Sequence, residues 1–268
     1  MKVGFQGEPG AYSEMATIQY FPNAEYVPMK SFQDVFDSVE SGKIDCAIVP
    51  IENSIEGSIN EAYDLLLQTS MVVSGEIYQR IKHCLIVNKN TVSINVVYSH
   101  PQALAQCRTY LQNRRLEPIA TYDTAGAVKM IKEKRIMDAA AIASRRAAEL
   151  YEMVILEEGI EDRKNNFTRF LVLSKLDTKP TGHDGTSIIF SVPHAPGALF
   201  DILEEFANRD INLTRIESRP TKETPWEYNF YVDFEGHVCD KIVGEALHSI
   251  KRKTAFIKIL GSFKRAEF

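Results

Sequence analysis

The sequence lacks the features that would tie the protein to a membrane, to nucleic acid or to an oxidising compartment. Its four cysteines, Cys46, Cys84, Cys107 and Cys239, are scattered and form no C-x-x-C pair. It has no run of about 18 apolar residues and no signal peptide. Lys and Arg total 31 against 36 acidic residues, and the resulting charge of −5 offers nucleic acid no general attraction. We therefore expect a reduced, cytoplasmic protein that binds neither membranes nor nucleic acid.

A metal site is also not expected, although two histidines stand near cysteines. His83 directly precedes Cys84, and His100 is followed by Cys107. This spacing matches none of the ligand patterns of structural zinc sites. We interpret these four residues as packing or polar residues of the interior.

What is present is the composition of an ordinary globular protein, divided into two regions. The 268 residues, 44% hydrophobic and 25% charged, suit one large domain or two smaller ones. The segment KLDTKPTGHDGT, at 175–186, has almost no apolar side chains and contains one proline and two glycines, which is typical of a linker. We predict a first domain over residues 1–176, a linker over 177–185 and a second domain over 186–268.

The first region alternates apolar runs with helical patterns, which predicts an α/β architecture. Strands are expected at KVGF, DCAIVPI, NVVYS and AAAIA, followed by helices over residues 12–20, 60–68, 101–114 and 144–151. A further helix is expected after Ser31, because Asp34 completes a capping box and Gly42 suits the C-terminal cap.

The second region has a simpler pattern. Strands are expected at SIIFSV, NLTRIESRP, EYNFYVDFEG and TAFIKILGSF, with helices over residues 198–209 and 240–253. The order βαββαβ is that of a ferredoxin-like module, and such modules commonly pair with a second copy of themselves.

Polar residues of the first region gather where an apolar run ends and a helix begins. The segments are QGEPGAYS (6–13), ENSIEGS (52–58), SHPQ (99–102) and the turn at Ser144. In open α/β sheets ligands bind at these ends, where unpaired backbone N–H groups favour an anion. The glycines match neither the dinucleotide nor the phosphate-loop motif, so a nucleotide is not expected. Each segment is equally what a tight turn or a helix cap requires, so both interpretations stay open.

A further segment, NNFTRF (165–170), leads straight into the apolar strand LVLS. The planar fork of Arg169 suits a carboxylate. The alternative is a plain strand, in which Thr168 and Phe170 share one face and Arg169 lies on the other.

Taken together, these segments resemble the prephenate dehydratase family with its C-terminal ACT regulatory domain. The motifs follow one another as GEPGAYS, VPIENSIEGS, SHPQALAQC, YDTAGA, AAIAS and NNFTRF, and then PGALF and IESRP. The resemblance implies a two-lobed catalytic region like a type 2 periplasmic binding protein, with one lobe of residues 1–78 and 160–176 and the other of 79–159. The chain would cross between the lobes near 77–82 and 159–166.

The resemblance also implies an activity, the conversion of prephenate to phenylpyruvate with loss of carbon dioxide and the ring hydroxyl, without a metal or other cofactor. Thr168 is implied as the donor to the departing hydroxyl, and Glu52 is a rival proton donor if burial raises its pKa. Asn53 and Gln102 complete the implied catalytic group. The implied substrate-binding residues are Arg169, Ser13, Ser54, Ser99 and Phe170.

In ACT-bearing dehydratases phenylalanine binds between ACT domains and inhibits. Regulation through an interface implies a homo-oligomer, a dimer or a tetramer. The residues implied to bind phenylalanine are Gly197, Ala198, Leu199, Asn212, Glu217, Ser218, Arg219 and Pro220.

Two other functions remain open from the sequence. An arogenate dehydratase would keep the fold and use the amino analogue of prephenate, and a small-molecule sensor would keep the two lobes without catalysis. The absence of a basic DNA-binding face disfavours the sensor. Because the first expected strand begins at the start of the chain, no N-terminal chorismate mutase domain is expected.

Overall fold

The computed structural model describes residues 1–221 and 226–267, and its elements confirm the expected α/β class. The described residues form two compact units. One comprises Met1–Ala62 and Ile77–Phe170, and the other comprises Tyr63–Glu76 and Leu171–Phe268. Among the described helices, none is both long and apolar enough to cross a bilayer.

The first lobe is built on a six-stranded sheet of order β2-β1-β3-β11-β5, in which β4 pairs with β3. Strand β1 is parallel to both of its neighbours, as expected where helices connect consecutive strands. Its elements are β1 (Lys2–Gln6), α1 (Tyr12–Tyr20), β2 (Glu25–Met29), α2 (Phe32–Glu40), β3 (Cys46–Asn53), β4 (Gly57–Ser58), α3 (Asn60–Gln68), β5 (Val72–Arg80) and β11 (Phe167–Ser174).

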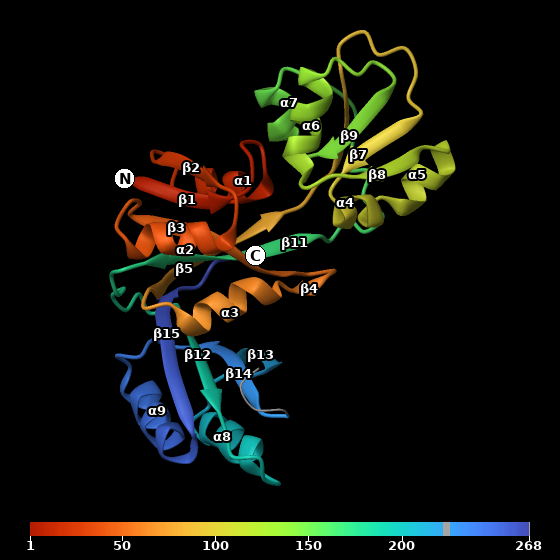
Figure 1. Cartoon of the computed structure of the whole chain (residues 1–268). Helices are drawn as coiled ribbons and strands as arrows, with labels where there is room; N and C mark the ends of the chain where they lie inside the picture. Colours follow the sequence, from red (N-terminus) through yellow and green to blue (C-terminus); the bar gives the residue numbers. More distant parts are fainter. Residues whose placement is uncertain (222–225, 268) are drawn as a thin grey trace. The chain divides into compact units, whose positions relative to one another are not determined.

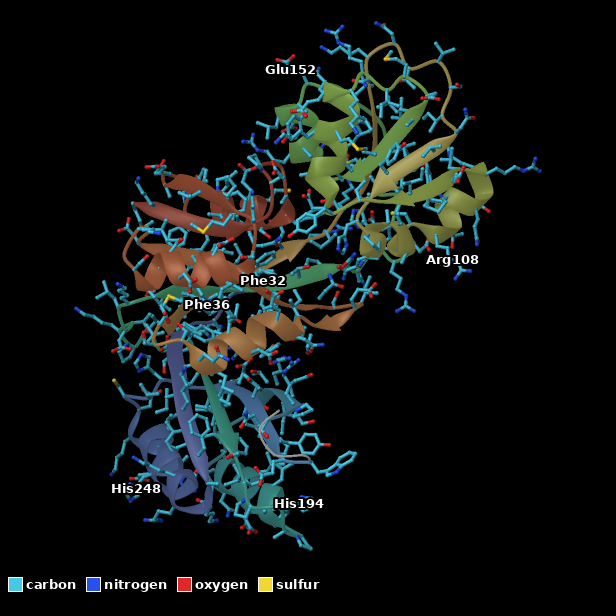
Figure 2. The ribbon with its side chains drawn as sticks, viewed as in Figure 1. Phe32, Phe36, Arg108, Glu152, His194 and His248 are labelled. Carbon is cyan, nitrogen blue, oxygen red and sulfur yellow. The ribbon has the colours of Figure 1, made fainter. Side chains whose placement is uncertain are left out.

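Helix α2 shows how the sequence specifies a local element. Ser31 and Asp34 form the predicted capping box, in which each side chain accepts a hydrogen bond from the other residue's backbone N–H. Figure 2 shows Phe32 and Phe36 on this helix; Phe36 is buried in the core, and Phe32 lies at the pocket described below.

The second lobe is a five-stranded sheet of order β10-β6-β9-β7-β8. Its central strand, Ala139–Ala143, is buried throughout because α6 and α7 pack on one face and α4 and α5 on the other. Small side chains on this strand allow both helix layers to approach closely. The elements are β6 (Cys84–Val87), β7 (Val96–Ser99), α4 (Pro101–Gln106), α5 (Arg108–Arg114), β8 (Glu117–Ala120), α6 (Thr124–Glu133), β9 (Ala139–Ala143), α7 (Arg145–Leu150) and β10 (Val154–Glu158).

The helix expected over 101–114 is interrupted at Cys107, which ends α4 and begins α5. Asp162, from the second crossing between the lobes, explains the break. Its backbone N–H donates to the Gln106 carbonyl at 2.7 Å, and its carboxylate accepts from the Thr109 N–H at 3.1 and 3.2 Å. The backbone groups freed at the break are therefore satisfied by tertiary contacts.

Two short segments connect the lobes, one between β5 and β6 and the other between β10 and β11 (Figure 1). A hydrogen bond joins the two segments, in which the His83 backbone N–H donates to the Glu161 carboxylate at 2.9 Å. The lobes therefore share a hinge of two connecting segments, which is the two-lobed periplasmic-binding-protein arrangement expected from the resemblance.

The second unit contains the predicted βαββαβ module, whose sheet is entirely antiparallel with the order β13-β14-β12-β15. Helices α8 and α9 cover one face through a core that includes Phe190, Phe206 and Phe234. Strand β12 starts at Asp184, so the last two residues of the predicted linker are already strand. The elements are β12 (Asp184–Ser191), α8 (Ala198–Ala207), β13 (Leu213–Pro220), β14 (Tyr228–Glu235), α9 (Lys241–Lys253) and β15 (Phe256–Lys264).

The C-terminal part of α3 also belongs to this second unit. The Lys258 ammonium donates to the carbonyls of Leu66 and Leu67, at 3.0 and 2.9 Å, and also to that of Thr69. These are carbonyls at the end of a helix, where a cation is favoured. The Tyr231 hydroxyl donates to the Tyr63 carbonyl at 3.0 Å. The module thus holds the end of α3 through its sheet.

Candidate functional site

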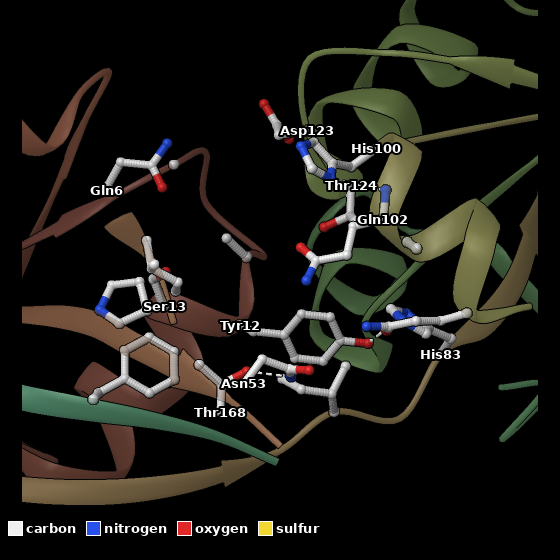
Figure 3. Close-up of a pocket in the computed structure, with 18 of the residues that line it drawn as sticks. Gln6, Tyr12, Ser13, Asn53, His83, His100, Gln102, Asp123, Thr124 and Thr168 are labelled. Carbon is white, nitrogen blue, oxygen red and sulfur yellow. Dashed lines mark hydrogen bonds between the residues drawn. The ribbon is translucent and has the colours of Figure 1, made fainter. Parts of the chain in front are cut away.

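A cavity of about 430 Å³ lies between the two lobes of the first unit. Figure 3 shows Gln6, Ser13 and Thr168 on one side of it, facing His100 and Gln102 on the other. The cavity is lined by Gln6, Gly7, Ala11, Tyr12, Ser13, Phe32, Pro50, Asn53, Ile59, Ile81, His83, His100, Gln102, Ala103, Gln106, Tyr122, Asp123, Thr124, Thr168 and Phe170.

Helix N-termini, and not lysine or arginine side chains, bring partial positive charge to the described lining of the cavity. The N-terminal residues of α1, α4 and α6 all contribute to the lining, and no lysine or arginine is among the described lining residues. The carboxylate of Asp123 is occupied as the N-cap of α6, where it accepts the Gly126 N–H at 2.5 Å. In the described part of the chain, no group of three or more His, Cys, Asp or Glu side chains is arranged to hold a metal ion. The cavity therefore suits a small anion.

Asn53 and Thr168 form the polar centre of this cavity. The Asn53 Oδ1 accepts the backbone N–H groups of Ile55 and Glu56 at 3.0 and 3.1 Å, which fixes the orientation of the carboxamide. Its Nδ2 must then point the other way, and it donates to Thr168 Oγ1 at 3.0 Å and to the Phe167 carbonyl at 3.2 Å. Because Thr168 Oγ1 accepts this bond and lines the cavity, its own proton is available to a ligand there.

The same amide group starts a buried chain of hydrogen bonds. Asn166 Oδ1 also lies 2.8 Å from Asn53 Nδ2, so the two protons of this amide are shared among three acceptors, and Asn166 Nδ2 donates to Gln106 Oε1 at 2.8 Å. The same oxygen lies 2.9 Å from His83 Nε2, and His83 Nδ1 lies 3.1 Å from the Tyr12 hydroxyl. The chain therefore runs from β3 of one lobe through α4 of the other and returns to α1.

Burial sets the protonation of the far end of this chain. It lowers the pKa of His83 below its usual value, although the hydrogen bond to Gln106 and the charge of Glu161 oppose the shift. Burial, reinforced by Cys84, raises the pKa of Tyr12 well above the value of an ordinary phenol. Near neutral pH both groups are accordingly uncharged.

The structure brings five of the nine predicted active-site residues to the cavity and leaves four outside its lining. Arg169 is buried to 8% exposure but does not line the cavity, as the alternation of a strand requires. Ser99 is fully buried and donates to the Ile142 carbonyl at 2.6 Å. Ser54 and Glu52 also lie outside the lining, and Ser54 Oγ accepts the Phe167 N–H at 3.0 Å. The five that line it are Ser13, Asn53, Gln102, Thr168 and Phe170.

Sequence reasoning missed four residues of the polar chain, of which Asn166 was noted only as part of the NNFTRF motif. Gln106 carried a usable signal, because it follows Gln102 by one helical turn and therefore shares its face of α4. His83 was interpreted as a packing or polar residue of the interior with no role in the site, and Tyr12 was not singled out. Their proximity depends on the return of the chain through the hinge, and no local pattern indicates it.

In the second unit the residues predicted to bind phenylalanine do not share one surface. Strand β13 alternates, so Ser218 and Pro220 are exposed while Glu217 and Arg219 are partly buried on the opposite face. There Arg219 Nη2 lies 2.9 Å from the Asp64 carboxylate, and Glu217 lies 3.5 Å from Arg215.

The remaining residues of this predicted site lie in two further places. Gly197, at φ 84°, precedes the first turn of α8, where Ala198 and Leu199 are partly buried. Asn212 donates to Glu235 at 3.2 Å and lines a separate hollow that contains none of the other predicted residues.

Comparisons with known proteins cover nearly the whole chain. A family model described as prephenate dehydratase matches residues 3–178, and one described as ACT domain matches residues 186–252. A bifunctional chorismate mutase/prephenate dehydratase of Aquifex aeolicus is 42% identical over 270 residues, covering 99% of this chain and 74% of the relative. An arogenate dehydratase/prephenate dehydratase of Arabidopsis thaliana is 42% identical over 276 residues, covering 98% and 72%.

Solved structures of the same size match closely as well. GqqA, described as a quorum quenching acylase, superposes with a TM-score of 0.92 at 32% identity, over 100% of this chain and 99% of that one. A prephenate dehydratase from Arthrobacter aurescens in complex with L-Phe gives a TM-score of 0.91 at 30% identity, over 99% and 90%. With its matching catalytic region, its ACT domain and these relatives, the chain belongs to the prephenate dehydratase family.

Proposed function

We propose that the chain is a prephenate dehydratase that converts prephenate to phenylpyruvate, carbon dioxide and water. The observation that carries this proposal is the Thr168 hydroxyl, which accepts from Asn53 and lines a cavity that the N-termini of helices also reach. The reaction is inferred from family membership, and the lining of the cavity provides the hydrogen-bonding groups that the reaction needs.

The proposed mechanism is one of positioning and hydrogen bonding. The bond between the ring and its carboxylate breaks, its electron pair enters the ring, and the ring expels the hydroxyl group as aromatic character forms. The oxygen leaves as hydroxide and takes up one proton from solvent to become water. Thr168 stabilises the charge that develops on this oxygen, because its proton is free to donate there. Glu52 does not line the cavity, so it is not assigned this role.

Prephenate is proposed as the substrate in preference to arogenate because of the charges in the cavity. Both substrates carry two carboxylates, and the N-terminus of α1, which no side chain caps, is placed to bind one of them. Arogenate also carries an ammonium group, which would require a carboxylate partner. Among the described lining residues the one carboxylate is that of Asp123, and the cap of α6 already engages it.

The ACT domain is proposed to make the enzyme sensitive to phenylalanine, as a homo-oligomer in the cytoplasm. The Arthrobacter relative, whose structure contains L-Phe, supports this regulation. Exposed Ser218 and Pro220, together with the N-terminus of α8 at Gly197, are the predicted ligand residues left free on the module's surface. The described cysteines are all unpaired, in keeping with a reducing compartment.

The test is to incubate the purified protein separately with prephenate and with arogenate, with and without added phenylalanine. Phenylpyruvate and phenylalanine are then measured separately by chromatography. We expect phenylpyruvate from prephenate, less turnover of arogenate, and inhibition by phenylalanine. Turnover of arogenate but not of prephenate would show that arogenate is the substrate. A saturation curve that phenylalanine leaves unchanged would refute the proposed regulation.

A third incubation covers the activity named for GqqA. An acyl amide is supplied in place of prephenate, and release of the free acid is measured. Hydrolysis of this amide with no turnover of prephenate would contradict the proposed function. The Thr168→Ala variant is run in parallel, so that any activity is tied to the cavity rather than to a contaminant.

A further inference from the structure

The polar chain that ends at Thr168 has a direction that the backbone determines. Backbone N–H groups can only donate, so the two that meet Asn53 identify its Oδ1 without ambiguity. Its Nδ2 therefore faces Asn166 Oδ1, and the other end of the Asn166 amide must present a donor. That donor meets Gln106 Oε1 at 2.8 Å, so the orientation of each amide follows from the one before.

His83 is the next group along, and the same logic fixes its tautomer. Gln106 presents an oxygen, which lies 2.9 Å from His83 Nε2, so this nitrogen must carry a proton. On the other side of the ring, Nδ1 faces the Tyr12 hydroxyl at 3.1 Å, and this hydroxyl also lies 2.8 Å from the Lys82 carbonyl. A neutral imidazole with a bare Nδ1 satisfies the Gln106 contact, and the single Tyr12 proton is then shared between Nδ1 and the Lys82 carbonyl.

His83 lies where the one hydrogen bond that its ring donates can affect the contacts between the lobes. The residue is 2% exposed, lies in a hinge segment, and its ring bridges α4 of one lobe and α1 of the other. With the imidazole in place, two donors hold Gln106 Oε1, one from Asn166 and one from His83. Without it, Gln106 keeps the hydrogen bond from Asn166 and the longer one, 3.4 Å, that its own Nε2 donates to Glu56, but Oε1 loses one of its two donors and the amide is held less tightly against Asn166.

We propose that His83 is a positioning residue of this site, which donates from Nε2 to Gln106 and thereby holds the amide chain that directs the Thr168 proton into the cavity. His83 exchanges no proton with the substrate in this role. The proposal rests on the proposed dehydratase function for its kinetic effect, and it predicts the tautomer independently of any activity.

Two substitutions separate positioning from proton transfer. His83→Gln keeps an N–H group near the position of Nε2, whereas His83→Leu removes it. With the full chain and prephenate, we expect His83→Leu to lower kcat about tenfold with KM changed less than about twofold, as for an interaction that acts on the transition state. We expect His83→Gln to stay within about threefold of the wild type in kcat.

His237 provides the matched control, because it is also 2% exposed but lies in the second unit. Its Gln and Leu variants should leave the kcat without phenylalanine unchanged. If the His83 pair loses turnover equally, His83 acts as an acid or base and the proposal is wrong. If neither His83 variant loses turnover, the donated bond has no catalytic consequence and the proposal is equally wrong.

The tautomer is measured on the intact protein by ¹⁵N NMR of its histidines, with the His83 signals identified by their loss in His83→Gln. We expect the pattern of a neutral ring protonated at Nε2, and protonation at Nδ1 alone would overturn the proposal. This readout keeps the proposal testable if His83→Leu fails to fold. If the wild type does not convert prephenate but His83 shows the expected tautomer, the proposed function fails and the geometric inference stands.

Discussion

Strands β11 and β13 each carry a motif in which an arginine follows a hydroxyl-bearing residue, yet the two strands lie in different environments. In β11 both Thr168 and Arg169 are 8% exposed, because the strand lies between β3 and β5 in its sheet. In β13, an edge strand, Ser218 is exposed while the Arg219 side chain is only 11% exposed. Neighbouring residues of a motif on a strand therefore lie on opposite faces of the sheet. The burial of the strand decides how much the two faces differ in their exposure to solvent.

The largest expected effect is the loss of turnover when Thr168 in β11 is replaced. Thr168→Ala removes the hydroxyl whose proton faces the cavity, and turnover should fall about a hundredfold or more. Stability should change little, because one hydroxyl is lost from an otherwise unchanged strand. Steady-state kinetics and thermal unfolding measure the two effects, with Thr168→Ser as the control that keeps a hydroxyl. A loss of tenfold or less would remove Thr168 from the proposed role.

The second prediction concerns the group that orients Thr168. Asn53→Asp keeps the oxygen that accepts from Ile55 and Glu56, but it replaces the donor facing Thr168 with an acceptor. The Thr168 proton would then turn toward the new carboxylate, and we expect kcat to fall at least about tenfold at pH 8. Full turnover in this variant would show that the donor does not orient the hydroxyl.

The third prediction tests the two faces of β13. Arg219→Met removes the partner of Asp64, whose side chain is 34% exposed, and should lower the free energy of unfolding by about 1 to 2 kcal/mol after allowance for solvent screening. Ser218→Ala on the exposed face should change it by less than about 0.5 kcal/mol. Urea unfolding of the full chain compares them. Unchanged stability in Arg219→Met, with loss of the phenylalanine response, would favour the ligand role implied by the resemblance.

The smallest expected effect is a pH dependence that arises at the cavity. Burial lowers the folded-state pKa of both His83 and His100. As the pH falls below about 6.5, the unfolded chain takes up protons that the folded chain refuses, so the free energy of unfolding should decrease. Thermal midpoints between pH 8 and 5.5 measure this decrease, and His83→Gln should remove part of it. A midpoint that rises on acidification would contradict the assigned directions.

Local elements could be predicted closely from the sequence. Helices α1 and α3 have the predicted bounds, the capping box at Ser31 is present, and the βαββαβ order of the second region is confirmed. These features depend on neighbours a few residues apart, through side-chain periodicity and cap chemistry. The break at Cys107 could not be predicted, because its backbone groups are satisfied by Asp162 from a distant segment.

The candidate site could be predicted only in part, because local motifs indicate some of its residues and distant contacts bring in the others. Asn53, Gln102 and Thr168 belong to motifs at strand and helix ends, and they reach the cavity because such ends from both lobes line it. Arg169 was assigned to the substrate by its chemistry, whereas the pleat of β11 directs it out of the cavity lining.

By itself the sequence determined the α/β class, the two regions, the family and the residue types that the chemistry requires. The tertiary structure decided which of those residues meet. It joined Tyr12, His83, Gln106 and Asn166 to Asn53 across two lobes, and it turned Arg219 toward Asp64. The physical reason is the range of the interactions. Caps and periodicity act within a few residues, but hydrogen-bond direction in a buried chain depends on groups that only the folded hinge brings together.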